Sequence, residues 1–306
     1  MPTQPAPSPY TGRFAPSPSG QLHFGSLVTA LASYLDARHH HGTWRVRMED
    51  IDEPRCIAGV GKTILNTLDV HGLHWDDAVL YQTQQHERYQ DTVNSLIADK
   101  KAYYCTCTRK QIKAQGGRYM GTCRGNHAYR NDAAIRLMLS TALPSFDDGI
   151  QGQIIPTHAF AEDIIIKRRD GLFAYNLVVA LDDDFQGVTH IVRGSDLLDV
   201  TPLQLCVYDA LDLTTPQYCH VPVASVSPGR KLSKQNHATP ICNKNALNNL
   251  SRALAFLGFS HINCADYDTV DALLSAAIEH WDRKVVPNVA EIIVDRSEST
   301  YYSDPL

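Results

Sequence analysis

Two short segments of the chain carry residue types suited to binding the phosphates of a nucleotide. His23 and Gly25, followed by Ser26, lie near the start, whereas Lys231 and Lys234 flank a serine far downstream. Glycine after histidine lets a helix N-terminus approach a phosphate closely, and the helix dipole favours anions there. Two lysines and a hydroxyl can stabilise a transferring phosphoryl group. The pair predicts an ATP site; either segment alone is equally typical of an ordinary helix start or a basic surface loop.

The elements around the first segment predict a βαβ unit. Residues 12–16 are typical of a short strand, and apolar residues recur at helical spacing over residues 25–38, with Gly42 as a stop. In residues 44–48, apolar residues alternate with two arginines, which predicts a half-buried strand. Units of this kind build parallel sheets, so we expect an α/β fold.

The rest of the chain continues this pattern with one interruption. Helices are expected at residues 63–70, 86–97, 202–211, 245–258 and 270–281, a strand at 188–192, and a hairpin of 164–166 with 172–175. Residues 101–127 are rich in Lys, Arg, Gly, Tyr and Cys and lack periodicity. They predict a small insertion held by something other than a hydrophobic core.

Three cysteines of this insertion have the spacing of metal ligands. Cys105 and Cys107 can bind one ion, and Cys123 is expected to lie close to them because it follows a glycine-rich loop. Tetrahedral zinc needs a fourth ligand, for which both Tyr119 and His127 are available. Four protein ligands leave no open position for water, so the predicted zinc site is structural.

Charged residues at the expected strand ends could hold an amino acid. Glu49 follows the second strand and could accept a hydrogen bond from an ammonium group, while Arg13 and Arg193 could form bidentate hydrogen bonds with carboxylates. Tyr175 is expected to end a later strand and to face the same crevice. A surface acid and surface ion pairs are the alternatives.

Two other clusters are expected to be unimportant for binding. Asp182, Asp183 and Asp184 form an acidic run typical of a solvated turn. The three histidines at residues 39–41 close a helix, where cations favour the dipole, and they are not expected to bind metal.

Composition limits the class of protein. The chain has 306 residues, room for roughly two domains, and its 43% hydrophobic and 20% charged residues are typical of a globular protein. No apolar run approaches the roughly 20 residues that cross a bilayer, and the proline-rich start does not resemble a signal peptide, so we expect a cytoplasmic protein without membrane contact. A net charge of −5 argues against extensive nucleic-acid contacts but leaves room for a local basic surface.

The eight cysteines occur in a chain without a secretory signal, which favours free thiols or metal ligands over disulfides.

Taken in order, the motifs resemble those of class I aminoacyl-tRNA synthetases, and within them of glutamyl-tRNA synthetases. The matching segments are residues 13–20, 22–25, 47–52, 187–194 and 231–234. Residues 22–25 match the HIGH signature, with Phe24 in place of isoleucine. Residues 231–235 match KMSKS, with Leu232 and Gln235 as departures.

The length of the chain refines this resemblance. After Gln235 only 306 − 235 = 71 residues remain, too few for the large helical anticodon-binding region of glutamyl-tRNA synthetases. The chain is therefore more similar to the truncated glutamyl-Q tRNA(Asp) synthetase family. The resemblance implies an α/β, Rossmann-type class I catalytic domain with a zinc-binding insertion and no anticodon-binding domain. The expected parts are a disordered lead-in (1–11), two halves of the catalytic domain (12–100 and 128–240), the insertion (101–127) and a short helical C-terminal region (241–306).

The resemblance also implies an activity and residue roles. Members of this family activate L-glutamate with ATP, without tRNA, and attach it to the queuosine base in the anticodon of tRNA(Asp). The implied catalytic residues are His23, Lys231 and Lys234. The implied glutamate site is Arg13, Phe14, Ala15, Pro16, Ser17, Glu49, Tyr175 and Arg193, and the implied ATP site is His23, Gly25, Ser26 and Lys234. One structural Zn²⁺ would be held by Cys105, Cys107, Tyr119 and Cys123, Mg²⁺ would accompany ATP, and a monomer is expected.

Three alternatives stay open on the sequence. A minimal glutamyl-tRNA synthetase would charge the 3′ end of tRNA instead of a base. A non-catalytic, zinc-bearing paralogue would bind tRNA without activating glutamate. A different adenylating ligase would need a specificity crevice other than one with two arginines.

Overall fold

A computed structural model of the chain describes residues 9–139, 142–157, 162–232 and 238–294. The strands are β1 (Thr11–Phe14), β2 (Thr43–Met48), β3 (Leu80–Tyr81), β4 (Ala102–Cys105), β5 (Ala134–Leu137), β6 (Phe146–Asp148), β7 (Gly152–Ile154), β8 (Ile164–Lys167), β9 (His190–Gly194), β10 (Gln217–Val221), β11 (Val223–Ser227), β12 (Arg230–Lys231) and β13 (Glu291–Ile293). The α-helices are α1 (Phe24–His39), α2 (Val60–Val70), α3 (His86–Ala98), α4 (Arg109–Ala114), α5 (Tyr175–Phe185), α6 (Thr201–Ala210), α7 (Ala246–Phe256) and α8 (Val270–His280). Short 3₁₀ helices include η1 (Glu53–Arg55), η2 (Gln82–Gln85), η3 (Ser195–Val200) and η5 (Asn243–Asn245). No helix in the described part of the chain combines the length and apolarity needed to cross a membrane.

The predicted βαβ unit is confirmed. Strands β1 and β2 pair in parallel with Arg13 opposite Arg45, and α1 connects them. The helix begins after His23, whose side chain accepts a hydrogen bond from the backbone of Ser26 and so caps a free N–H group. It ends before Gly42, whose N–H donates to the carbonyl of Ala37.

The central parallel strands meet at a reversal of chain order. One half of the sheet runs β1-β2-β3 and the other runs β7-β6-β10-β9. The N–H of Thr189, just before β9, donates to the carbonyl of Thr11 at 2.9 Å, so β1 and β9 lie side by side. Strand order thus reverses between β1 and β9. Open α/β sheets bind ligands at the carboxyl ends of the strands at such a point.

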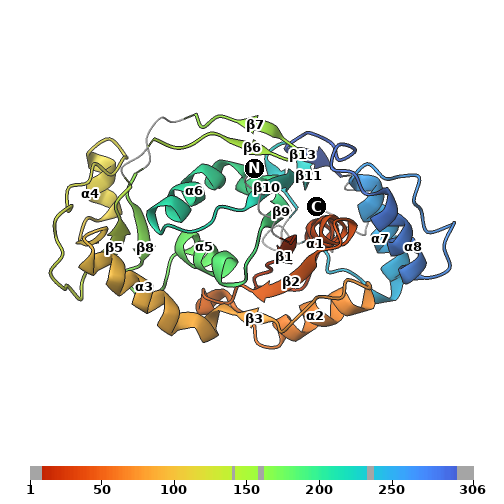
Figure 1. Ribbon diagram of the computed structural model, residues 1–306, viewed down its shortest axis with the longest axis horizontal. Coiled ribbons are helices and arrows are strands. Elements are labelled where there is room, and N and C mark those ends of the chain that lie inside the picture. The colour runs from red at the N-terminus through yellow and green to blue at the C-terminus, as the bar shows by residue number, and fades with distance from the viewer. Residues whose placement is uncertain (1–8, 140–141, 158–161, 233–237, 295–306) are drawn as a thin grey trace, which may run out of the picture.

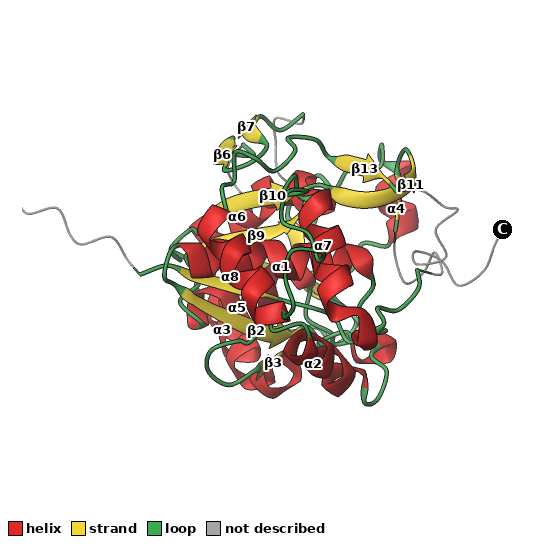
Figure 2. Ribbon diagram, turned by 90° about the vertical axis from the view of Figure 1, so that its right-hand side faces the viewer, coloured by secondary structure: helices red, strands yellow, loops and turns green. Residues whose placement is uncertain are grey.

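Helix α1 is the centre of the main hydrophobic core. Leu27, Leu31 and Leu35 are fully buried, and the helix packs against β1, β2 and β9. Helices α7 and α8 cover another side of α1 (Figure 1), and the view in Figure 2 shows the helices stacked along the sheet. Hydrophobic packing therefore joins the C-terminal helices to the first βαβ unit.

The cysteine-containing segment forms part of a second, antiparallel sheet. Strand β4 pairs with β5, which pairs with β8, so residues 102–105 are joined to strands as far along as residue 167. This sheet and α4 lie at the end of the molecule opposite α7 and α8 (Figure 1). Tyr103 and Cys105 of β4 belong to a small cluster with Tyr119 and Cys123, whereas Ala102 and Tyr104 of the same strand pack into a larger core with α3 and α5.

The predicted hairpin after β8 is only partly formed. The N–H of Ala174 donates to the carbonyl of Ile166 at 2.9 Å, but the second arm contributes a single bridge between Lys167 and Phe173. Tyr175 begins α5 and does not end a strand, which corrects the expectation. An unbroken run of buried residues, from Leu177 to Asp183, makes α5 an interior helix.

Candidate active site

A cavity of about 360 Å³ opens at the carboxyl ends of β1 and β9. It is lined by every residue predicted for catalysis, glutamate or ATP that the structure describes: Arg13, Phe14, Ala15, Pro16, Ser17, His23, Gly25, Ser26, Glu49, Tyr175, Arg193 and Lys231. The remaining predicted residue, Lys234, lies outside the described residues. Segments from five parts of the sequence therefore meet at one hollow, as expected where strand order reverses.

The start of α1 forms one side of the cavity. His23 is buried, its Nδ1 lies 3.3 Å from the Ser26 backbone nitrogen, and its Nε2 lies 3.2 Å from the Ser26 hydroxyl. A Cβ atom at position 25 would come within 3.3 Å of the His23 ring, so Gly25 leaves the approach to the helix start open. The side chain and backbone here suit an anionic group.

Strand β12 contributes Lys231 to the cavity lining. Lys231 on this strand places Nζ 2.6 Å from Oδ2 of Asp196, and both residues line the cavity. Strand β12 pairs with β11 in antiparallel fashion. The downstream lysine segment therefore begins at the same cavity as the histidine segment.

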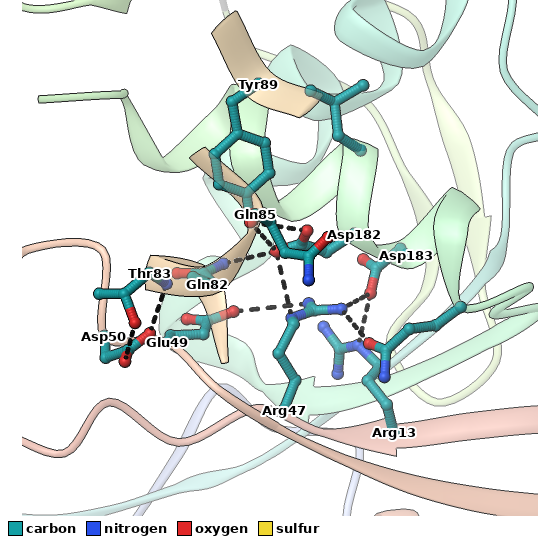
Figure 3. A network of polar contacts seen from close by, with 12 residues as sticks. Arg13, Arg47, Glu49, Asp50, Gln82, Thr83, Gln85, Tyr89, Asp182 and Asp183 are labelled. Atoms are coloured by element: carbon teal, nitrogen blue, oxygen red, sulfur yellow. Dashed lines mark hydrogen bonds and ion pairs between the residues drawn. The ribbon is translucent and has the colours of Figure 1, made fainter. Parts of the chain in front are cut away.

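A buried ion network supports the amino-acid side of the cavity (Figure 3). Arg47 is fully buried, and its Nη1 donates to Oδ1 of Asp183 at 2.8 Å. Nε of Arg13 donates to the same oxygen at 3.3 Å. Arg47 also reaches Oε1 of Glu49 at 3.5 Å. Asp183 therefore orients two arginines, of which Arg13 lines the cavity.

Asp182 forms a second branch of this network. It accepts from the hydroxyl of Tyr89 at 2.8 Å, from Nε2 of Gln82 at 2.8 Å and from Nη2 of Arg88 at 2.5 Å. These partners belong to η2 and α3. Asp182 thus connects helix α5 to η2 and α3.

The structure corrects two expectations about these residues. The acidic run is no solvated turn, because Asp182 and Asp183 are 0% exposed and lie in α5. The alternation predicted for β2 holds from Thr43 to Val46 but not at Arg47, which is also 0% exposed and bonds to Asp183 of α5. Sequence reasoning missed this network because its partners are 136 and 170 residues apart. The apolar helical run ahead of Asp182 is the one local signal that could have found it.

The network sets the charge state of the two acids nearest the cavity. Burial raises the pKa of Glu49 above the ordinary value, and the guanidinium groups of Arg47 and Arg13 oppose this rise. Burial acts in the same direction on Asp183, but Arg47 and Arg13 outweigh it and hold the pKa of Asp183 below the ordinary value. The negative charge of Asp183 is thus stabilised by the two arginines, whereas a cationic ligand group beside Glu49 would further stabilise its negative charge.

Arg193 and Tyr175 complete the lining. Nη1 of Arg193 is buried and has no hydrogen-bond partner among the described residues, although its other nitrogens are bonded. Tyr175, the first residue of α5, is 37% exposed. Arg193 therefore lines the cavity with one guanidinium nitrogen that has no hydrogen-bond partner in the described part of the chain.

The three predicted cysteines come together near the end of the molecule. The Sγ atoms of Cys105, Cys107 and Cys123 lie within 4.8 Å of one another, and those of Cys107 and Cys123 are 3.5 Å apart. Sγ of Cys105 is 3.6 Å from the Tyr119 hydroxyl. With Zn–S bonds of about 2.3 Å, the edges of a tetrahedral site measure roughly 3.8 Å. The cluster can hold a metal ion and is consistent with a zinc site.

The two candidate fourth ligands differ in their distance from the cysteines. Nδ1 of His127 lies 3.0 Å from the carbonyl of Ala102, and His127 does not belong to the cysteine group. Tyr119 accepts from the Cys123 backbone N–H at 3.0 Å, and the Arg136 guanidinium lies 3.9 Å over its ring. The side chain beside the cysteines is therefore Tyr119.

Comparisons with known proteins agree with this geometry. The family described as tRNA synthetases class I (E and Q), catalytic domain, matches residues 10–252. The chain is 47% identical to a glutamyl-Q tRNA(Asp) synthetase of Shewanella oneidensis, over 94% of this chain and 95% of the relative. It is 49% identical to one of Yersinia pseudotuberculosis, over 92% of this chain and 85% of the relative.

Solved structures share the fold at lower identity. A glutamate tRNA ligase from Elizabethkingia meningosepticum in complex with its amino acid superposes with a TM-score of 0.73 at 21% identity, over 92% of this chain and 66% of that one. A glutamate-tRNA synthetase from Elizabethkingia anophelis gives 0.75 at 20% identity, over 95% and 69%. The family match and the near-full-length relatives show that the chain belongs to the glutamyl-Q tRNA(Asp) synthetases, within the class I tRNA synthetases (E and Q).

Proposed function

We propose that this protein activates L-glutamate with ATP, without tRNA, and transfers the glutamyl group to the queuosine base of tRNA(Asp). The observation that carries the proposal is one cavity that Glu49, Arg13 and Arg193 line together with His23 and Lys231. The names of the relatives, which cover nearly the whole chain, supply the acceptor.

Glutamate would bind at the arginine side of the cavity. Glu49 accepts from the substrate ammonium, and Arg13 and Arg193 donate to its carboxylates. Residues 14–17 and Tyr175 form the walls around it. This assignment uses the free Nη1 of Arg193 and gives Glu49 the cationic partner that its burial calls for.

ATP would bind across the start of α1. His23, Gly25 and Ser26 would face its phosphates, and Lys231 and Lys234 would supply positive charge. A carboxylate oxygen of glutamate attacks the α-phosphorus in line, and the bond from phosphorus to pyrophosphate breaks. The histidine and lysines stabilise the charge that develops in this transition state. Mg²⁺ would supply further charge neutralisation for the pyrophosphate.

In the second step a nucleoside hydroxyl of queuosine attacks the carbonyl carbon of the adenylate. An ester forms, the proton leaves the hydroxyl, and AMP departs. A basic segment supports contact with tRNA. Residues 101–131 contain no Asp or Glu, and their basic residues are Lys101, Arg109, Lys110, Lys113, Arg118, Arg124 and Arg130. Arg109, Lys110 and Lys113 are exposed on α4, where they could bind phosphates.

The cysteine cluster would hold one structural Zn²⁺ through Cys105, Cys107, Cys123 and Tyr119. Four protein ligands close the site to water, so the ion stabilises the β4–β5–β8 sheet and takes no part in the reaction. We expect one equivalent of zinc in freshly purified protein prepared without chelators. Protein without zinc would contradict this part of the proposal.

The decisive experiment is glutamate-dependent exchange of pyrophosphate with ATP, measured with and without tRNA. We expect exchange without tRNA, and a fall of about 10²- to 10³-fold in the Lys234→Ala variant. Absence of exchange in the wild-type protein would overturn the proposal and favour a non-catalytic tRNA-binding role. Nuclease mapping of radiolabelled glutamate then locates the acceptor, since label at the 3′ end of tRNA would indicate a minimal glutamyl-tRNA synthetase.

A further inference from the structure

Two buried residues behind Arg193 determine which of its nitrogens is left for a ligand. Nε of Arg193 donates to Nε2 of His220 at 3.0 Å, and Nη2 donates to Oγ1 of Thr201 at 2.8 Å. The ring of Tyr218 lies 5.0 Å from the guanidinium carbon. These contacts hold the guanidinium in one orientation, and Nη1 remains without a partner among the described residues.

The bond from Arg193 requires one tautomer of His220. Nε of arginine is always a donor, so Nε2 of His220 must carry a lone pair and the ring proton must be on Nδ1. Nδ1 lies 2.6 Å from Oδ2 of Asp148, which accepts that proton in a hydrogen bond. His220 is 0% exposed, and burial holds its pKa below the ordinary value even though Asp148 opposes this. The imidazole is therefore neutral.

Asp148 is itself held in place by the backbone. Its Oδ1 accepts from the N–H groups of His220, Ile150 and Gln151 at 3.0, 3.0 and 2.8 Å. The three side chains of Asp148, His220 and Arg193 come from neighbouring strands β6, β10 and β9, with His220 directly opposite Arg193 in the β9–β10 register. The chain Asp148–His220–Arg193 thus crosses the sheet and ends at the cavity.

We propose that Asp148 and His220 are positioning residues that aim Nη1 of Arg193 at a carboxylate of the amino-acid substrate. Asp148 selects the tautomer of His220, and His220 in turn fixes the rotation of the guanidinium. The inference rests on the proposed function, because it assumes that the cavity binds glutamate through Arg193.

The Asp148→Asn variant tests the tautomer directly. The three backbone N–H groups keep the amide oxygen of the new side chain at the Oδ1 position, so its NH₂ group faces His220. Nδ1 of His220 must then accept a hydrogen bond, so the ring proton moves to Nε2. The Nε2–H group of His220 and the Nε–H group of Arg193 are both donors, and the hydrogen bond between them is lost. The same replacement of Asp by Asn selects the wrong histidine tautomer in a catalytic triad. We expect KM for glutamate to rise about 10- to 100-fold in the exchange assay, with kcat and KM for ATP within about threefold. Calorimetric titration with glutamate alone should show the same loss.

Substitutions of His220 separate positioning from stability. His220→Gln offers an oxygen acceptor near the place of Nε2 and should stay within about threefold of the wild-type KM for glutamate, whereas His220→Leu should match Asp148→Asn. His71, another fully buried histidine, bonds to Thr67 and Asn249 away from the cavity. His71→Leu should lower the melting temperature and leave KM for glutamate unchanged.

The outcomes distinguish the two proposals. If the wild-type protein neither exchanges pyrophosphate nor binds glutamate, the proposed function fails. If the wild-type protein is active and Asp148→Asn keeps its KM for glutamate, the positioning role is overturned. The positioning role also fails if His71→Leu raises KM for glutamate as much as His220→Leu, since the effect would then follow stability alone.

Discussion

At the scale of single residues, the charges around the cavity match a dicarboxylic amino acid. Arg13 and Arg193 contribute two positive charges to the lining and Glu49 one negative charge, which leaves a net charge of +1. Lys231 and Asp196 pair with each other and cancel. An amino acid with two carboxylates and one ammonium carries −1, so its binding neutralises the site group by group.

Removing the charge of Glu49 should weaken glutamate binding selectively. For Glu49→Gln we expect KM for glutamate to rise about 10- to 100-fold, with KM for ATP within twofold, because the substrate ammonium loses the carboxylate proposed to bind it. Glutamate-dependent pyrophosphate exchange measures both constants. Asp52→Asn removes a charge from the same loop, beside Arg55 and outside the cavity lining, and should leave both constants unchanged. An unchanged KM for glutamate in Glu49→Gln would contradict the role of Glu49.

At the scale of elements, the parallel strands and the antiparallel sheet carry different groups of functional residues. The parallel strands place the lining residues at their carboxyl ends, where β1 and β9 lie side by side. The antiparallel β4–β5–β8 sheet carries Cys105, and α4 lies beside this sheet at the end of the molecule opposite α7 and α8 (Figure 1). Activation and tRNA contact are therefore expected to respond to different substitutions.

Reversing the charge of α4 should separate these two activities. In a triple variant with Arg109→Glu, Lys110→Glu and Lys113→Glu, we expect transfer of glutamate to tRNA to fall about tenfold or more, because phosphate contacts are lost. Pyrophosphate exchange without tRNA should stay at the wild-type rate.

A matched control changes the net charge equally at exposed lysines elsewhere. The triple variant Lys62→Glu, Lys244→Glu and Lys284→Glu should transfer glutamate to tRNA at nearly the wild-type rate. If both triple variants lose transfer alike, the effect is one of overall charge and α4 is not a tRNA contact.

At the scale of the whole molecule, one buried carboxylate joins distant parts of the chain. Asp36 in α1 is 0% exposed and accepts from Tyr10, from Nε1 of Trp281 at 2.9 Å and from Arg283 at 2.7 and 2.8 Å. It therefore fixes the segment after α8 to the first βαβ unit. Burial alone would raise the pKa of Asp36, but the bonds from Arg283, Tyr10 and Trp281 hold it below the ordinary value.

This carboxylate should make stability depend on pH. Because the folded-state pKa of Asp36 is lowered, its contribution is present above the unfolded value of about 4 and is lost as pH falls through the folded value. Asp36→Asn should lower the free energy of unfolding at pH 7 by about 3 kcal/mol. In urea titrations followed by circular dichroism, the difference in free energy of unfolding between Asp36→Asn and the wild type should become smaller as the pH is lowered from about 5 to about 3. A difference that stays constant over this range would contradict the assignment, and Asp132→Asn at an exposed pair should change little at either pH.

Local pattern was enough for much of the fold and most of the cavity lining. The βαβ unit, the helices over residues 86–97 and 270–281 and the strand that carries Arg193 follow from periodicity and turn residues, which act over a few neighbours. The predicted turn forms, but the second arm of the hairpin stops early because Tyr175 begins a helix that packs in the interior.

The sequence by itself determined the residue types that do the chemistry and their order: His23 before a glycine, an acid after the second strand, arginines at strand ends and three spaced cysteines. Only the tertiary structure decided that Asp183 and Arg47 are buried together and that Asp148 and His220 stand behind Arg193. The reason is physical, since the charges of Asp148 and Arg47 are stable in the interior only beside partners that folding brings from 72 and 136 residues away.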